Sequence, residues 1–170
     1  MNEKLQPAVT ALKERFGGTD SEFRGDVTVT LAPGRVVPAA RALLAEFGFD
    51  MLVNETAVDY WPQQDPRFHV VYHLYSMKNN VLLCLRVPLS GNAPHIPTME
   101  NVFPGANWPE REMYDMFGIF FDGHSDLRRI VMPHDWEGHP LRKDYPLGYE
   151  EVQHSFNFNE ISARKPSAKE

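Results

Sequence analysis

Residues 68–87, FHVVYHLYSMKNNVLLCLRV, decide the fold. Apolar side chains at every second position give the first half one apolar face, formed by Phe68, Val70, Tyr72 and Leu74. This alternation is typical of a half-buried β-strand. The turn residues Lys78-Asn79-Asn80 then precede a second run that favours strands, Val81 to Val87. Because a tight turn joins antiparallel neighbours, the stretch predicts a β-hairpin.

The chain before this hairpin predicts two more strands. Residues 49–60 are rich in residues that favour strands and should add a third antiparallel neighbour. In DVTVTLA, residues 26–32, Val27, Val29 and Leu31 alternate with polar side chains until Pro33-Gly34 breaks the pattern. The tight Asn-Asn turn favours an antiparallel meander over parallel crossovers.

Two segments carry the spacing of amphipathic helices. The first has Leu5, Val9, Leu12 and Phe16 on one face, and Gly17-Gly18 can close it. The second repeats the spacing from Val36 to Phe47, with Pro38 in its first turn and Gly48 at its end. We therefore predict an α+β fold with two helices packed on a mainly antiparallel sheet.

The composition changes at Pro88, since residues 88–146 hold 8 of the 14 prolines. That segment therefore cannot be mainly sheet or long helix. One short helix is predicted in WPEREMYDMF, residues 108–117, with Asn107 or Trp108 near the cap and Gly118 as the closing residue. A long extended C-terminal segment should follow it. We predict an α/β domain over 1–103, and a helix plus an extended partner-binding segment over 104–170.

Composition and charge limit the function. The 42% hydrophobic content favours a globular protein, and the formal charge of −6 argues against a nucleic-acid partner. The single cysteine, Cys84, cannot build a disulfide framework, a four-cysteine zinc site or an iron-sulfur cluster, and it is interpreted as a core residue. No stretch has the apolar length of a membrane span or a signal peptide. We expect a water-soluble bacterial cytoplasmic protein that reaches a membrane only through another protein.

Charge and histidine are concentrated in residues 110–145, with eight acids, five bases and three histidines. A metal-dependent hydrolase could use the His/Asp-rich region 122–139, but His124, His134 and His139 are ten and five residues apart, with prolines between them. We therefore expect no metal site and no catalytic residue, and hydrogen-bonded histidines instead. The mixture of acids, arginines and aromatics in EREMYD, LRRI and PLRKDYP favours a protein interface.

The run from Trp108 to Leu147 closely resembles the C subunit of NADH-quinone oxidoreductase, the respiratory complex I family. The likeness lies in E-R-E at 110–112, in the group around Arg128, Ile130 and Val131, and in D-W-x-G-x-P-L-R-K-D-Y-P from Asp135 to Pro146. The resemblance implies that the subunit interface contains the following residues: Glu110, Arg111, Glu112, Asp115, His124, Arg128, Arg129, Asp135, Trp136, Pro140, Arg142, Lys143, Asp144 and Tyr145.

The resemblance implies a non-catalytic structural subunit of the hydrophilic, peripheral arm, on the cytoplasmic side of a bacterial inner membrane. It implies no cofactor in this chain, with FMN and iron-sulfur clusters in partner subunits that carry electrons from NADH to quinone while protons are pumped. The implied partners are chiefly the D subunit, and also the B and I subunits. Three alternatives remain: the equivalent subunit of a membrane-bound hydrogenase or of a ferredoxin- or F420-linked dehydrogenase, a stand-alone metal hydrolase, and a soluble adaptor.

Overall fold

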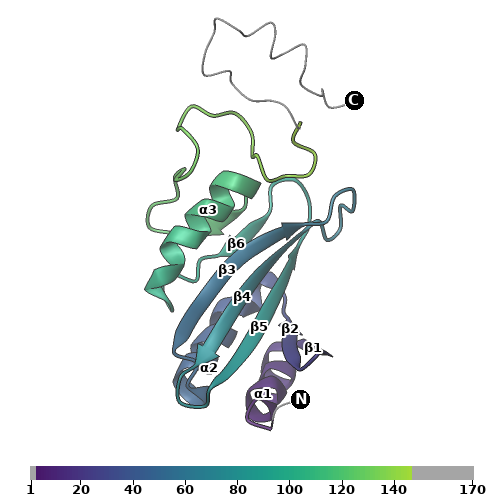
Figure 1. Ribbon diagram of the computed structural model, residues 1–170, viewed down its shortest axis with the longest axis vertical. Helices are drawn as coiled ribbons and strands as arrows, with labels where there is room; N and C mark the ends of the chain where they lie inside the picture. The colour runs from purple at the N-terminus through teal and green to yellow at the C-terminus, as the bar shows by residue number, and fades with distance from the viewer. Residues whose placement is uncertain (1–2, 147–170) are drawn as a thin grey trace, which may run out of the picture.

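The computed structural model describes residues 3–146, and a five-stranded sheet forms its centre (Figure 1). The strand order is β1-β2-β5-β4-β3. The bounds are Thr19–Phe23 for β1, Asp26–Thr30 for β2, Met51–Asp59 for β3, Phe68–Ser76 for β4 and Val81–Leu89 for β5. The predicted α+β class, with a mainly antiparallel sheet, is confirmed.

The predicted hairpin is β4 and β5, which pair from Phe68 opposite Leu89 to Ser76 opposite Val81. Asn80 closes the turn at a φ of 52°, a left-handed conformation that asparagine tolerates better than most residues. β3 pairs antiparallel with β4 on the other side, so the predicted three-stranded meander is confirmed. The alternating residues of β4 are buried as the sequence predicts, and Phe68, Val70, Tyr72 and Leu74 are fully inaccessible.

The meander does not extend to the other strands. β2 pairs with β5 in parallel, from Thr28 opposite Cys84 to Thr30 opposite Arg86, so the expectation of no parallel crossover is wrong at this pair. The connection from β2 passes through a helix before the chain enters the meander, and this allows the parallel pairing. β1 was not predicted, because its sequence, TDSEF, has no apolar alternation and is largely exposed at the sheet edge.

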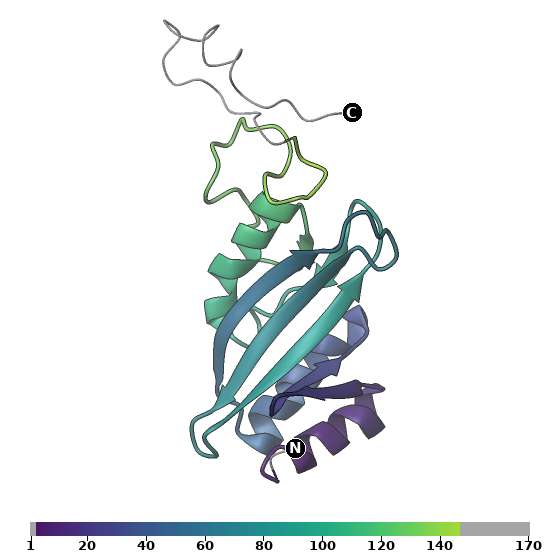
Figure 2. The same cartoon turned by 45° about the vertical axis from the view of Figure 1, so that its right-hand side comes forward.

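Two helices, α1 (Gln6–Phe16) and α2 (Val36–Phe47), lie against one face of the sheet (Figure 2). Each ends as predicted at a glycine with positive φ, 70° at Gly17 and 71° at Gly48. A 3₁₀ turn, Pro33–Arg35, precedes α2. The apolar faces of both helices join the sheet in one core. Cys84 lies outside this core, half-buried on the opposite face of β5, which corrects its interpretation as a core residue.

The third helix, α3 (Asn107–Phe117), packs beside β3 and follows a 3₁₀ turn, Pro104–Ala106. It ends as predicted at Gly118, with φ 71°. Short strands β6 (His95–Pro97) and β7 (Phe120–Asp122) flank it and pair in parallel. Phe103, Ala106, Met113 and Ile119 share the main core, so the boundary predicted between 103 and 104 divides residues that pack together. That boundary stays a prediction.

Residues 123–146 form turns and extended chain above the end of α3, coloured yellow-green in Figure 1. Tyr149, Phe156 and Phe158, which belong to the predicted partner-binding segment, lie outside the described residues. No helix between residues 3 and 146 has the length and apolar character that a membrane crossing requires.

Candidate subunit interface around α3

Glu110 anchors the inner face of α3 to the chain after β6. Its carboxylate accepts hydrogen bonds from the Thr98 hydroxyl and the Met99 main-chain N–H, both at 2.5 Å. The residue is fully inaccessible, and burial raises the pKa of its carboxyl to about 7, although both hydrogen bonds act in the opposite direction. Glu112 is exposed, so the two acids of the ERE motif point in different directions as expected.

Asp115 fixes the chain that follows β7 against α3. One carboxylate oxygen, Oδ2, accepts the main-chain N–H groups of Ile130, Val131 and Met132 at 2.8 to 3.0 Å. The other, Oδ1, lies 2.5 Å from the Arg129 guanidinium. Burial alone would raise the pKa of Asp115, but these donors together lower it. The carboxylate is therefore ionised and serves as a main-chain clamp.

Arg111 behaves differently from the acids beside it. Its Nε and Nη2 atoms donate to the main-chain carbonyls of Arg128 at 3.2 Å and Arg129 at 3.4 Å. Its guanidinium lies 5.2 Å from the ring centroid of Trp108, a cation-π contact. No carboxylate between residues 3 and 146 pairs with it, so the acids and the arginine of the ERE motif do not pair with one another.

Arg111 also lines a pocket of about 450 Å³ beside α3, called here the basic pocket. Its other lining residues are Tyr114, Leu127, Arg128, Arg129, Met132 and His134. None of them is acidic. The pocket therefore presents a positive surface next to the exposed ring of Trp108.

Two of the three histidines of the hydrolase hypothesis, His124 and His139, contact main-chain groups. His124 Nδ1 accepts the N–H of Asp126 at 3.0 Å, and this assigns the proton to Nε2, which lies 3.1 Å from the Asn107 carbonyl. His139 Nδ1 lies 2.9 Å from the Asp115 carbonyl, and His134 is exposed. Within residues 3–146, no three His, Cys, Asp or Glu side chains are grouped so that they could hold a metal ion.

The end of the described chain is tied back to the sheet. Arg142 donates to the carbonyls of Phe117 and Asn92. Asp144 lies 2.6 Å from Arg67, and the main-chain N–H of Lys143 donates to Asp59 at 2.9 Å. Asp59 and Arg67 are themselves paired at 3.0 Å in the interior. Residues 142–144 therefore pack on their own domain, although they belong to the predicted partner-binding segment.

Sequence reasoning did not single out Asp59 or Arg67. One signal was present for Asp59, because it alternates in phase with Ala57, and a residue in phase with a buried strand position points inward. Arg67 precedes the alternating run of β4 and carried no such signal.

The structure brings only some of the predicted interface residues together. Asp115 meets Arg129, whereas Arg128 pairs with the exposed Asp126. Asp135 and Lys143 are exposed, and Trp136, Pro140 and Tyr145 are half-buried. The indole N–H of Trp136 is buried and has no acceptor among the described residues.

Known proteins match almost the whole chain. Residues 29–151 match the family model described as the 30 kDa subunit of respiratory-chain NADH dehydrogenase. The NADH-quinone oxidoreductase C subunit of Roseiflexus sp. (strain RS-1) is 52% identical over 98% of this chain and 95% of its own length. The C subunit of Geobacter sulfurreducens is 48% identical over 82% of this chain and 88% of its own length.

Two solved structures share the fold. A trypsin-resistant fragment of Nqo5, residues 1–134, is 31% identical and superposes with a TM-score of 0.63 over 73% of this chain and 99% of its own. A component of the membrane-bound sulfane sulfur reductase, an archaeal respiratory membrane complex, has a TM-score of 0.69 over 82% of this chain and 83% of its own, but at 21% identity this shows the fold alone. With the family model and the close relatives in agreement, the chain belongs to the 30 kDa, or C-subunit, family of the NADH-quinone oxidoreductases of complex I.

Proposed function

We propose that this chain contributes no reacting group of its own and serves complex I as a scaffold subunit. One observation carries the proposal: the acids on the inner face of α3 hold the chain's own backbone. Asp115 accepts three consecutive main-chain N–H groups, and Glu110 accepts one more together with the Thr98 hydroxyl. Carboxylates whose oxygens accept internal donors in this way hold the chain in one conformation.

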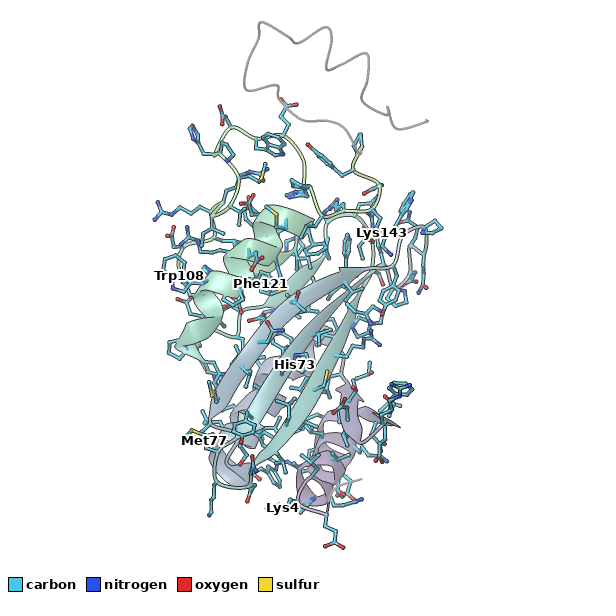
Figure 3. All side chains as sticks on the ribbon, viewed as in Figure 1. Lys4, His73, Met77, Trp108, Phe121 and Lys143 are labelled. Atoms are coloured by element: carbon cyan, nitrogen blue, oxygen red, sulfur yellow. The ribbon has the colours of Figure 1, made fainter. Side chains whose placement is uncertain are left out.

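The outer side of α3 is the surface proposed to meet partner subunits. Trp108 and Val131 are 62% and 60% exposed, and Figure 3 shows Trp108 on the side of α3 away from the strands. Large exposed apolar side chains beside arginine are typical of protein interfaces. Following the resemblance, the chief partner is the D subunit, with the B and I subunits nearby, and the FMN, the iron-sulfur clusters and the quinone site belong to partner subunits. The chain then lies on the cytoplasmic side of a bacterial inner membrane as a peripheral subunit.

Co-purification tests the scaffold proposal. An affinity-tagged chain, expressed in its host and extracted in mild detergent, should bring down the D, B and I subunits. Trp108→Ala should weaken this recovery, whereas Phe23→Ala, at a 71% exposed aromatic on β1, should leave it intact. Recovery of the wild-type chain without complex I subunits would refute the scaffold role. Equal recovery of complex I subunits with Trp108→Ala and Phe23→Ala would show that the interface does not lie on the outer side of α3.

Metal analysis of the same preparation separates a scaffold from a hydrolase. The purified chain should carry no stoichiometric zinc or iron, because His124 and His139 are committed to main-chain groups. One tightly bound metal ion per chain, lost when His124 or His139 is replaced, would contradict the proposal.

A further inference from the structure

Arg111 is the nearly buried cation of α3, and no carboxylate among residues 3–146 neutralises it. The side chain is almost buried, with the residue only 9% exposed. Both of its hydrogen bonds go to neutral carbonyl oxygens, those of Arg128 and Arg129. The Nη1 atom makes no hydrogen bond to residues 3–146, so its two hydrogens are available to a ligand. A nearly buried cation in this state favours an anionic partner.

The other charged residues of the basic pocket indicate how much negative charge the partner should carry. Arg128 and Arg129 also line the basic pocket, but they are paired with Asp126 at 2.8 Å and Asp115 at 2.5 Å. The pocket therefore holds about one uncompensated positive charge, that of Arg111. A single negative charge matches it. A carboxylate fits this requirement better than a phosphate group of higher charge.

The walls of the pocket suit a protein side chain. Leu127, Met132 and Tyr114 provide apolar surface beside Arg111. The methylene groups of an aspartate or glutamate can rest on such surface while the carboxylate meets the guanidinium. The ring of Trp108 also contacts that guanidinium. Tryptophan and arginine are among the residues most enriched where binding energy is concentrated in interfaces.

From these observations we infer that the basic pocket receives the carboxylate of an aspartate or glutamate on a partner subunit, bound by Arg111 beside Trp108. This inference rests on the scaffold role proposed above, and adds the chemical group that the partner must present.

The test measures how tightly the full chain binds the peripheral-arm subcomplex prepared without it. Arg111→Met removes the charge and should weaken binding by roughly 30-fold or more, the usual loss for one member of an interfacial charge pair. Arg111→Lys keeps the charge but lacks the planar fork, and its affinity should fall between those of Arg111→Met and wild type. Arg41→Met removes an exposed arginine of α2 outside the pocket and should change affinity less than twofold.

A second pair of variants does not depend on how well Arg111→Met folds. Arg128 lines the pocket with a side chain that is 72% exposed, so its replacement leaves the core intact. Arg128→Glu places a negative charge at the pocket and should weaken binding at least tenfold at low salt, whereas Arg128→Lys should bind within twofold of wild type. The difference between these two should shrink as salt is raised.

The outcomes separate the two proposals. If wild type fails to bind the subcomplex at all, the scaffold role falls. If the wild-type chain binds and the variants Arg111→Met and Arg128→Glu bind as tightly as wild type, only the carboxylate inference is overturned. Vesicles of phosphatidylglycerol provide the lipid comparison. Suppose that the vesicles bind the wild-type chain but not Arg111→Met, and that these two chains bind the subcomplex equally well. The occupant is then a lipid phosphate, and the inference fails.

Discussion

Arg67 and Asp59 form a two-point ion pair inside the protein, with Nε 3.1 Å from Oδ1 and Nη2 3.0 Å from Oδ2. The two side chains are 0% and 1% exposed. The same guanidinium also contacts Asp144, 77 residues further along the chain. This pair therefore connects the end of β3, the start of β4 and the last described residues.

Arg67→Met should destabilise the fold by roughly 3–5 kcal/mol, because it leaves the Asp59 carboxylate buried without its partner. Urea denaturation, compared with Arg41→Met as an exposed control, measures the change in the free energy of unfolding. The double variant Asp59→Leu, Arg67→Met should recover part of the loss, since no buried charge is then stranded. A loss below about 1 kcal/mol for Arg67→Met would show that solvent reaches the pair.

Asp115→Asn should loosen residues 129–132 without unfolding the sheet. An amide offers one acceptor oxygen where the carboxylate serves three main-chain N–H groups and Arg129, so local stability should fall by roughly 1–3 kcal/mol. Trypsin cleavage after Arg128 or Arg129 should then accelerate roughly 5- to 100-fold, as the population of the open segment rises.

Mass spectrometry of a timed digest locates those cuts. Asp126→Asn is the matched control, because Asp126 is 48% exposed by side chain and contacts only the exposed Arg128 among these basic residues. Equal cleavage of both variants would mean that the Asp115 clamp does not hold the segment. Asp115 and Arg142 attach the described part of the extended C-terminal segment to the domain, so wild type should be cut there more slowly than Asp115→Asn.

The sequence predicted best the elements whose burial is local. Alternation from Phe68 to Leu74 identifies β4 because its inward side chains all lie in one core. Gly17, Gly48 and Gly118 also indicated where α1, α2 and α3 end. Few residue types other than glycine adopt the positive φ that these helix ends require. β1 has one side of its ladder open and polar residues on both faces, so no local pattern marks it.

Pairings between distant segments could not be predicted from local pattern. The parallel contact of β2 with β5 and the contact of Arg67 with Asp144 depend on where the chain returns, which no window of neighbouring residues records. At the candidate site, the motif predicted the side chains but not their roles. Glu110 shares the inner face of α3 with Met113, three residues on, and that spacing was the available sign that this acid is buried.

Glu110 should make the protein less stable as pH rises through neutrality. Its pKa is about 7 in the fold against an ordinary value of 4.5, so the folded state binds more protons than the unfolded state between those values. The contribution of Glu110 to the free energy of unfolding is fully present below pH 4.5 and is lost as pH rises through 7. The total loss is about 3 kcal/mol. Denaturation at pH 5, 6, 7 and 8 should show the decline. Glu110→Gln should remove its own part of the decline and leave the part that comes from Glu55, whose pKa is also raised, whereas Glu112→Gln, on the exposed face of the same helix, should leave the decline unchanged. A decline unchanged in Glu110→Gln would assign it to another group.

Glu55 supplies the last prediction, because neither of its carboxylate oxygens has a hydrogen-bond partner among the described residues. Its side chain points inward from β3 and is almost inaccessible, and burial, followed by the nearby charge of Glu110, holds its pKa well above the usual range. The Tyr72 hydroxyl is also buried without a partner among those residues. Burying a neutral carboxyl group here lowers the stability of the fold, because the group loses its hydrogen bonds to water and gains none in the protein.

Glu55→Leu should therefore stabilise the protein by about 1–3 kcal/mol at pH 6, the desolvation cost of an unsatisfied polar group. The gain should grow at pH 9, because there the unfolded state keeps an ionised Glu55 that the folded interior resists. Glu55→Gln isolates the second effect, since it retains a buried polar group but cannot ionise. It should match wild type at low pH and exceed it at high pH. If Glu55→Leu instead destabilised the protein at every pH, the carboxyl would be satisfied by a buried water molecule shared with Tyr72, and the polar pair would be a stabilising part of the core.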